Sequence, residues 1–250
     1  MTHAAMINPF YANRLKRVAT PTEARDRPVY ARLPLAPRNA SPVPHLTSLY
    51  HFNRAGEYGD RSYPGNCGGN LIKDVLRYFQ PQGMVCDPMS GSGTCADVCQ
   101  ELGIPCMSWD IHRGIDACDP EGFSAAETFD FIWAHPPYWR QKLYAIDERD
   151  LSRAPTLEAF IRRYGQFVRN CAVALKPAGK LAILIGDYQD REAGFMPLVY
   201  HTKRLAFAAG LRQCCTDIIR FSHGASSSKK VYRSSFIPGL HDVCMIFQRS

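Results

Sequence analysis

The chain alternates between short, fully apolar runs and longer stretches in which apolar residues recur every three or four positions. The first pattern is typical of buried β-strands and the second of amphipathic helices. Strands are predicted at 85–87, 104–110, 129–134, 181–185, 211–221 and 241–247. Helices are predicted at 71–79, 95–102, 157–175 and 195–209, the first three capped by Asn70, Thr94 and Thr156.

The order of these elements predicts the fold class. Strands and helices alternate through most of the chain, and the last two strands are separated by a Ser- and Lys-rich segment, 222–235. The alternation predicts an α/β fold with a doubly wound, mostly parallel sheet, and the closing pair predicts an antiparallel hairpin at one edge. Ligands in such sheets bind beyond the carboxyl ends of the strands, so the loops that follow the strands are the candidate site.

Two regions of different composition divide the chain of 250 residues, 46% of which are hydrophobic. Residues 1–45 have no apolar period, whereas 46–250 carry the periodic patterns and are long enough to form one α/β domain. Residues 1–48 hold seven prolines and a net charge of +5, out of +7 for the whole chain. We expect 1–45 to be an extended basic arm that either binds a polyanion or wraps the domain surface.

The rest of the composition bears on where the protein is located and on the state of its cysteines. No apolar run approaches membrane-spanning length and the N-terminus lacks the order of a secretion signal, which predicts a soluble cytoplasmic protein with no membrane partner. The ten cysteines form no Cys-x-x-Cys pair, as expected of reduced core thiols. Cys95 and Cys99 would share a helix face, with His112 not far along, but four ligands at zinc spacing cannot be assembled. No metal site is therefore predicted.

Two loops that follow predicted strands carry residues suited to ligand binding. They are Asp87-Pro88-Met89-Ser90-Gly91-Ser92-Gly93-Thr94 and His135-Pro136-Pro137-Tyr138-Trp139. The two glycines of the first loop allow positive φ and a close approach of the backbone to a ligand. The acid that ends the next strand, Asp110, stands with its neighbour Ile111 where a ribose is held in this kind of sheet. The alternative for Asp110 is to cap the next turn.

The two loops together resemble the Asp-Pro-Phe-x-Gly-Ser-Gly-Thr and (Asp/Asn/Ser)-Pro-Pro-Tyr motifs of the S-adenosylmethionine-dependent amino methyltransferases that modify adenine or cytosine in DNA. The resemblance extends less sharply from residue 46 to the C-terminus, and it implies a Rossmann-like class I methyltransferase fold with a seven-stranded sheet. It assigns the first loop to the methionine part of the cofactor. The implied cofactor contacts are Tyr63, Asp87, Pro88, Gly91, Ser92, Gly93, Thr94, Asp110, Ile111 and, for the adenine amine, Asp116.

The same resemblance implies a catalytic role for the second loop. The Pro136 carbonyl and the side chain of His135 would accept the two hydrogens of the base amine, with Pro137 fixing the loop. Tyr138 would stack on a flipped base and Trp139 would widen that platform, or both rings simply pack the loop. His135 departs from the Asp, Asn or Ser of the family, and only its neutral form can accept a hydrogen bond. A structural histidine in a non-catalytic protein is the alternative.

DNA is the substrate and partner that the resemblance implies, with the basic arm as a phosphate contact. Met89, in place of Phe, is shared with RNA amino methyltransferases, so an RNA substrate is one alternative, and a non-catalytic binding module of the same fold is another. Whether cytosine N4 or adenine N6 is the acceptor stays open, with Trp139 favouring cytosine. Only 140–155 and 222–235 remain for base recognition, so specificity is short and relaxed, or a partner protein supplies it.

Overall fold

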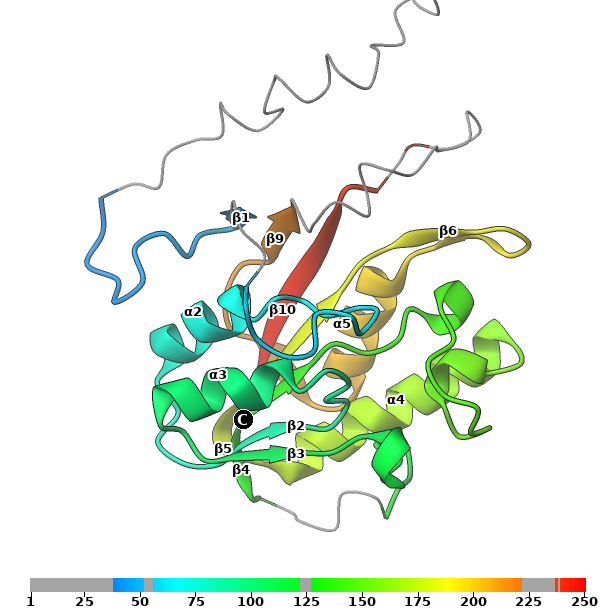
Figure 1. The fold of residues 1–250 in the computed structure, drawn as a ribbon, viewed down its shortest axis with the longest axis horizontal. Coiled ribbons are helices and arrows are strands. Elements are labelled where there is room, and N and C mark those ends of the chain that lie inside the picture. Colours follow the sequence, from blue (N-terminus) through cyan, green and yellow to red (C-terminus); the bar gives the residue numbers. More distant parts are fainter. Residues whose placement is uncertain (1–37, 52–55, 122–126, 222–236, 238) are drawn as a thin grey trace, which may run out of the picture. The chain divides into compact units, whose positions relative to one another are not determined.

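A computed structural model describes residues 38–51, 56–121, 127–221, 237 and 239–250, of which Asn39–Ser250 belong to one compact unit (Figure 1). Most of the predicted arm and the whole of the segment 222–235 lie outside the described residues. Among the described residues, no helix combines the length and apolar character that a bilayer span requires. The helices are α2 Asn70–Phe79, α3 Thr94–Leu102, α4 Leu157–Ala174 and α5 Leu198–Ala208, with single 3-10 turns at Ile111–Arg113, Trp139–Gln141 and Leu151–Arg153.

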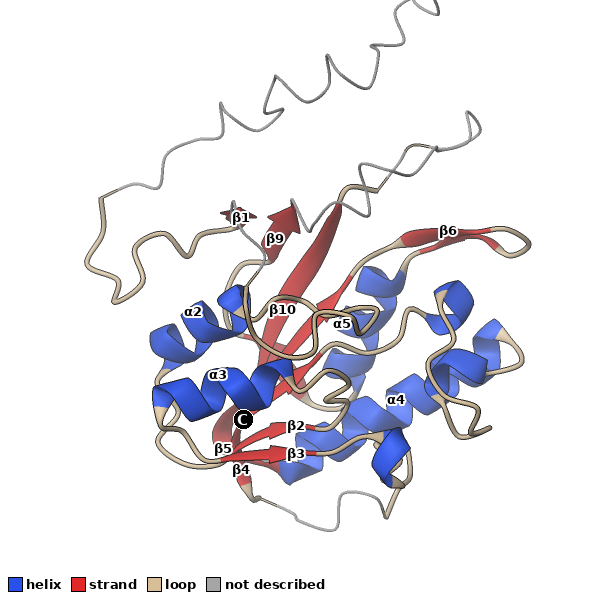
Figure 2. Cartoon of the chain, in the orientation of Figure 1, coloured by secondary structure: helices blue, strands red, loops and turns tan. Residues whose placement is uncertain are grey.

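The main sheet has eight strands, seven of them in the order β1, β9, β10, β5, β4, β2, β3, with β8 paired to β10 (Figure 2). The strands of this sheet are β1 Leu49–His51, β2 Val85–Asp87, β3 Cys106–Ser108, β4 Phe129–Ala134, β5 Leu175–Ile185, β8 Leu211–Gln213, β9 Ile218–Phe221 and β10 His241–Arg249. The pairs β1–β9, β4–β5, β2–β4 and β2–β3 are parallel, and β10 runs antiparallel to β5, β8 and β9. The predicted α/β class with a mostly parallel sheet is therefore confirmed.

The core divides into two layers because side chains of a strand point alternately to opposite faces. On β5, Leu181, Ile183 and Ile185 join the cluster that contains α4 and α5, whereas Ala182 and Leu184 join the cluster that contains α2 and α3. β10 divides in the same manner, and so does β4 from Phe131 onward, after an irregularity between Phe129 and Phe131. Helices thus cover both faces, which is why the central strands read as continuous apolar runs in the sequence.

The topology also fixes where a ligand site can form. β2 lies between β3 and β4, so the chain leaves β2 to build the sheet on one side and later returns to build it on the other. A sheet of this kind opens at such a reversal, beyond the carboxyl ends of its strands. Both predicted motif loops follow strands that meet here, since β2 pairs in parallel with β4.

Several element boundaries differ from those predicted. The predicted helix 195–209 begins at Leu198, because the preceding residues form an antiparallel pair, β6 Tyr188–Asp190 with β7 Gly194–Met196. The predicted strand 211–221 is two strands, β8 and β9, which pair with different parts of β10. The short β1, which was not predicted, adds a strand beyond β9. The antiparallel pair of β9 and β10 therefore lies inside the sheet and not at its edge.

Two of the predicted helix caps are also wrong. The N-cap of α2 is Gly69 and that of α3 is Gly93, both left-handed with φ of 80°, so Asn70 and Thr94 are the first helical residues. Positive φ at the entry suits glycine better than a side-chain cap. The predicted cap of α4 is confirmed, because the Thr156 hydroxyl accepts from the Ala159 amide at 3.1 Å.

Candidate active site

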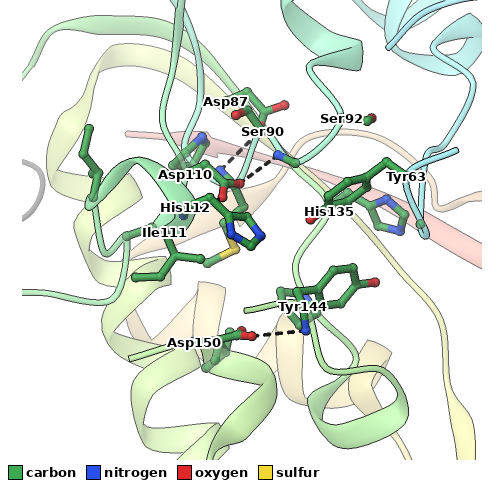
Figure 3. Close-up of a pocket in the computed structure, with 18 of the residues that line it drawn as sticks. Tyr63, Asp87, Ser90, Ser92, Asp110, Ile111, His112, His135, Tyr144 and Asp150 are labelled. Atoms are coloured by element: carbon green, nitrogen blue, oxygen red, sulfur yellow. Dashed lines mark hydrogen bonds between the residues drawn. The ribbon is translucent and has the colours of Figure 1, made fainter. Parts of the chain in front are cut away.

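An open cavity lies at the carboxyl ends of β2, β3 and β4, with about 800 Å³ of empty space including the part open to solvent (Figure 3). This size suits a cofactor or small substrate. Eleven of the predicted site residues line it: Tyr63, Asp87, Pro88, Gly91, Ser92, Thr94, Asp110, Ile111, Asp116, His135 and Pro137. The other four predicted residues, Gly93, Pro136, Tyr138 and Trp139, are not among the residues that line it.

The glycine loop is held tightly around the start of α3. Gly91 has φ of 44°, and a Cβ atom added to it would lie 2.9 Å from the ring of Tyr63. Gly93 has φ of 80°, but a Cβ there would meet nothing within 4 Å. Gly91 is thus required for close approach as well as for its conformation, whereas Gly93 is required for its conformation alone.

Asp87 ends β2 and faces the cavity as a buried carboxyl group, 4% exposed. Burial raises its pKa well above the usual carboxyl range, although the Met89 amide donates to its Oδ1 at 3.2 Å. Burial disfavours the charged form of a carboxyl group, and a nearby positive charge stabilises it. A ligand that carries an ammonium or sulfonium group would supply that positive charge.

Asp110 organises the loops on the other side of the cavity. Its Oδ2 accepts from the Gly91 amide at 2.8 Å and its Oδ1 accepts from the His112 amide at 2.9 Å. It therefore caps the turn Ile111–Arg113, which is the alternative that the sequence left open. A carboxylate offers about four acceptor directions, so two amide contacts leave capacity for a ribose hydroxyl.

Asp116 is held in a similar way at the cavity wall. Its Oδ1 accepts from the Cys118 amide at 2.9 Å, and its Oδ2 pairs with Arg163 at 3.0 Å. Arg163 lies on α4, so the pair ties the wall of the cavity to the helix on that face of the sheet. The predicted contact of Asp116 with an adenine amine would share oxygens with these partners.

His135 follows the last residue of β4 and lines the cavity half-buried, with its Nε2 at 3.3 Å from the Tyr138 hydroxyl. Tyr138 packs instead against the core and beside Gly186, where an added Cβ would lie 3.3 Å from its ring. Burial raises the pKa of the Tyr138 phenol. Its ring is therefore part of the support behind the loop, and stacking on a ligand remains only a prediction.

Trp139 lies in the core and not among the residues that line the cavity, so its predicted platform role stays a prediction. Trp139 is 3% exposed and its indole nitrogen donates to the Ala154 carbonyl at 2.8 Å. It has a φ of 45°, and its ring lies in the core cluster that contains Phe160, with the two ring centroids 6.5 Å apart. A large ring with a satisfied N–H is a packing anchor, which is the alternative that the sequence allowed.

Four lining residues that sequence reasoning did not assign come from residues 140–155, here named the covering loop. Tyr144, Arg149, Asp150 and Leu151 line the cavity. Asp150 is 3% exposed and accepts from the amides of Ala145 and Ser152 and from the Ser152 hydroxyl, at 2.7, 2.9 and 2.6 Å. The Asp-x-Ser spacing is a turn signal that could have identified this anchor.

Two aromatic rings from separate loops meet across the cavity mouth. The rings of Tyr63 and Tyr144 are stacked, with centroids 6.0 Å apart and an interplanar angle of 22°. Figure 3 shows both side chains on the same side as His135 and opposite Ile111 and His112. Burial, and then the nearby charge of Asp110, raises the pKa of Tyr63 to about 12, so its hydroxyl is neutral at physiological pH.

Neither a family model nor a curated protein sequence matches the chain. Among solved structures it is similar to TTHA0409 of Thermus thermophilus, named "Putative DNA Modification Methylase", in complex with S-adenosyl-L-methionine: 19% identity, 54% of this chain, 53% of that chain, TM-score 0.39. It is similar to TrmN of Thermus thermophilus with 18% identity, covering 72% of this chain and 48% of that chain with a TM-score of 0.44. It is also similar to a SAM-dependent methyltransferase of Archaeoglobus fulgidus with 16% identity, covering 72% of this chain and 93% of that chain with a TM-score of 0.45. The chain spans about half the length of the first two proteins.

Proposed function

We propose that this chain is an S-adenosylmethionine-dependent methyltransferase that modifies the exocyclic amine of a flipped base in DNA, cytosine N4 or adenine N6. The observation that carries the proposal is the convergence of two motif loops, distant in the sequence, on one cavity. Asp87 and Gly91 line it from the first loop and His135 lines it from the second. The parallel pairing of β2 and β4 brings the two loops together, and residues of both motifs face the same cavity, which supports a shared ligand site.

The residues around the first loop fit the cofactor. Gly91 lets the backbone approach a ligand where a side chain would collide with Tyr63. Asp87 offers a buried carboxylate to the cofactor's positive charge, and Asp110 retains acceptor capacity for a ribose. When bound, S-adenosylmethionine would supply a methyl group activated by its positive sulfur. The role of the protein is then to align that methyl group with an acceptor.

The second loop would orient the acceptor amine. A ring amine is a poor nucleophile because its lone pair is conjugated with the ring, so fixing its two hydrogens in a productive direction supplies much of the catalysis. We assign His135, which lines the cavity, as one acceptor, and the carbonyl of Pro136, which is not among the lining residues, as the second on the resemblance alone. The buried Trp139 at the end of the loop restricts its movement. Tyr144 and Leu151, from the covering loop, would limit the access of water.

Nucleoside mass spectrometry tests the proposal. The protein is incubated with isotopically labelled S-adenosylmethionine and either duplex DNA or RNA, and the digested nucleosides are analysed. We expect labelled N4-methylcytosine or N6-methyladenine from DNA, and none from the His135→Ala variant. Label in RNA alone would replace the DNA assignment with the RNA alternative. Binding of the cofactor with no label in either polymer would identify a non-catalytic module.

The basic segments predict how DNA would be held. If Arg14, Arg32 and the rest of the arm contact phosphates, affinity for duplex DNA falls with salt, with a log–log slope of roughly −0.9 per contact. Deletion of residues 1–38 should flatten this slope without changing which base is methylated. Neutralising Lys229, Lys230 and Arg233, which also lie outside the described residues, tests the second basic segment. Parallel lines for all three proteins would show that neither segment touches DNA.

A further inference from the structure

Three cysteine thiols converge where α3 packs on β3, and none of the three is among the residues that line the cavity. Cys95 and Cys99 lie one turn apart on α3, and Cys106 is the first residue of β3. Their sulfur atoms all lie within 4.8 Å of one another. Cys95 and Cys99 are fully buried, and all three belong to the core layer that contains α2 and α3. The protein has seven other cysteines, and among the described residues none of them belongs to such a group of three.

The spacing of the sulfur atoms suits coordination of a metal ion. Zinc binds thiolate sulfur at about 2.3 Å, so two sulfurs on one tetrahedral ion are separated by about 3.8 Å. Three sulfurs already within 4.8 Å of one another reach that arrangement by small side-chain rotations. Cys95 is the second residue of α3, where the positive end of the helix dipole stabilises negative charge.

The face of β3 that carries Cys106 supplies one more polar group. Ser108 follows Cys106 by two positions and so points to the same face of the strand. Its hydroxyl oxygen is buried beside the Cys106 thiol, and it has no other hydrogen-bond partner among the described residues. Buried hydroxyl groups are normally hydrogen-bonded. The Ser108 hydroxyl, beside the three thiols, is therefore placed to act as a weak fourth ligand of a metal ion that they bind.

We propose that Cys95, Cys99 and Cys106 bind one Zn²⁺ ion as thiolates, with the Ser108 hydroxyl or a water molecule completing a tetrahedral site. Binding releases the three thiol protons to solvent, and three thiolates with a divalent ion leave a net charge of −1 at a site made of two buried cysteines and one half-buried cysteine. The sequence could not identify this site, because only the packing of α3 on β3 brings the Cys106 thiol to the two thiols of α3.

The position of the ion gives it a structural consequence. α3 begins at the glycine loop and β3 leads to Asp110, whose carboxylate accepts from Gly91. A metal bridge between α3 and β3 therefore fixes the two walls of the cavity relative to one another. The metal site itself does not depend on the proposed function; only an effect of the ion on cofactor affinity does.

Titration with Cd²⁺ tests the site, because cadmium–thiolate bonds absorb in the ultraviolet. The protein is kept reduced and freed of metal, in a background with Cys214→Ser and Cys215→Ser, since these neighbouring, partly exposed thiols are a second possible cadmium pair. We expect one Cd²⁺ per chain, displaced by Zn²⁺. In Cys99→Ala or Cys106→Ala, affinity should fall roughly 100-fold or more. Cys171→Ala, which removes an equally buried thiol from the other core layer, is the matched control and should bind normally.

Zinc should also raise the midpoint of thermal unfolding of the background protein and of Cys171→Ala, but not of Cys99→Ala. A second measurement needs no substitution in the cluster: alkylation under mild denaturation, read by mass spectrometry, should show zinc protecting Cys95, Cys99 and Cys106 selectively. This keeps the proposal testable if a cluster variant does not fold. Absence of metal binding by the reduced background protein, or protection spread evenly over all its cysteines, would overturn the proposal.

Discussion

The amide of Gly91 donates to the carboxylate of Asp110 at 2.8 Å, and this bond joins the loop after β2 to the loop after β3, beside a backbone bond from the Ser90 amide to the Trp109 carbonyl at 2.9 Å. The bond makes the shape of the glycine loop depend on an acid that comes from the neighbouring strand. Asp110 also accepts from His112, so its position is fixed from both sides. The two loops on this side of the cavity therefore form one unit.

Asp110→Ala should weaken S-adenosylmethionine binding more than the loss of one ligand contact would. The change leaves the Gly91 and His112 amides without their acceptor, and hydrogen bonds to a charged group contribute about 1.5–3 kcal/mol each. We expect at least a tenfold higher Kd in calorimetric titration, together with lower stability to urea. Asp119→Asn, an exposed acid nearby in the chain, is the matched control. Unchanged affinity in Asp110→Ala would separate this acid from the cofactor site.

Gly91→Ala and Gly93→Ala should differ, although both residues have positive φ. Each change costs roughly 1–2 kcal/mol of backbone strain. Only Gly91→Ala also places a methyl group 2.9 Å from the Tyr63 ring. We expect Gly91→Ala to be the less stable variant in urea denaturation, and the double variant with Tyr63→Ala to regain part of the loss. Equal stability of the two single variants would mean that the loop relaxes freely.

Trp139→Phe should lower stability while leaving methyl transfer largely intact. The change keeps a buried ring but removes the indole N–H that donates to the Ala154 carbonyl. An orphaned buried acceptor costs about 1–3 kcal/mol. Chemical denaturation measures the loss, and initial rates under conditions where the variant is fully folded measure the activity. A large fall in rate with unchanged stability would restore the stacking role that the structure argues against.

Much of the fold could be predicted because its signals are local. β4 has the predicted bounds, since a run of six residues that is apolar except for Asp130 and lies between polar loops fits only the sheet interior. α4 begins where Thr156 can cap it. The β6–β7 pair was missed, because three-residue strands carry too short a pattern to compete with the apolar helix that follows.

The parts of the site that could not be predicted depend on packing between distant segments. Trp139 is adjacent to a motif that suggests exposure, yet its burial is decided by Ala154 in the loop that follows. Tyr144 reaches the cavity because Asp150 gathers the backbone of its own loop. Cys106 joins Cys95 and Cys99 only when β3 lies against α3. Apart from the Asp-x-Ser turn signal at Asp150, no pattern along the chain encodes these contacts.

Asp87→Asn should stabilise the free protein at neutral pH and weaken the cofactor. Burial raises the pKa of Asp87, so above the ordinary carboxyl pKa of about 4 the folded state retains a proton that the unfolded state releases. The stability of the free protein therefore falls as the pH rises from that value towards the folded-state pKa. Asparagine keeps an acceptor for the Met89 amide and removes the charge.

Urea denaturation at about pH 5 and about pH 8 measures this effect. The wild type should lose more stability between the two values than Asp87→Asn, whereas Asp119→Asn should follow the wild type. Calorimetry should show roughly a 30-fold or greater loss of S-adenosylmethionine affinity in Asp87→Asn, as expected when one member of a buried charge pair is removed. A variant with wild-type pH dependence and affinity would show that Asp87 is not the counter-charge of the cofactor.

His135→Ala and His135→Asn should separate the acceptor role of this side chain from a structural one. His135 lines the cavity with its Nε2 at 3.3 Å from the Tyr138 hydroxyl, so one ring can either hold Tyr138 or face a substrate amine. If it accepts from the amine, alanine removes the acceptor and asparagine restores one. We expect the methyl-transfer rate to fall at least about 100-fold in His135→Ala and to recover largely in His135→Asn, with cofactor affinity changed little in both.

The pH profile adds an independent readout. A protonated imidazole has no acceptor lone pair and repels the positive cofactor, so the wild-type rate should fall at acidic pH, whereas the His135→Asn rate should stay flat over the same range. Recovery in His135→Asn with an unchanged acidic decline would assign that decline to another group, and a full rate in His135→Ala would place the acceptor elsewhere in the cavity.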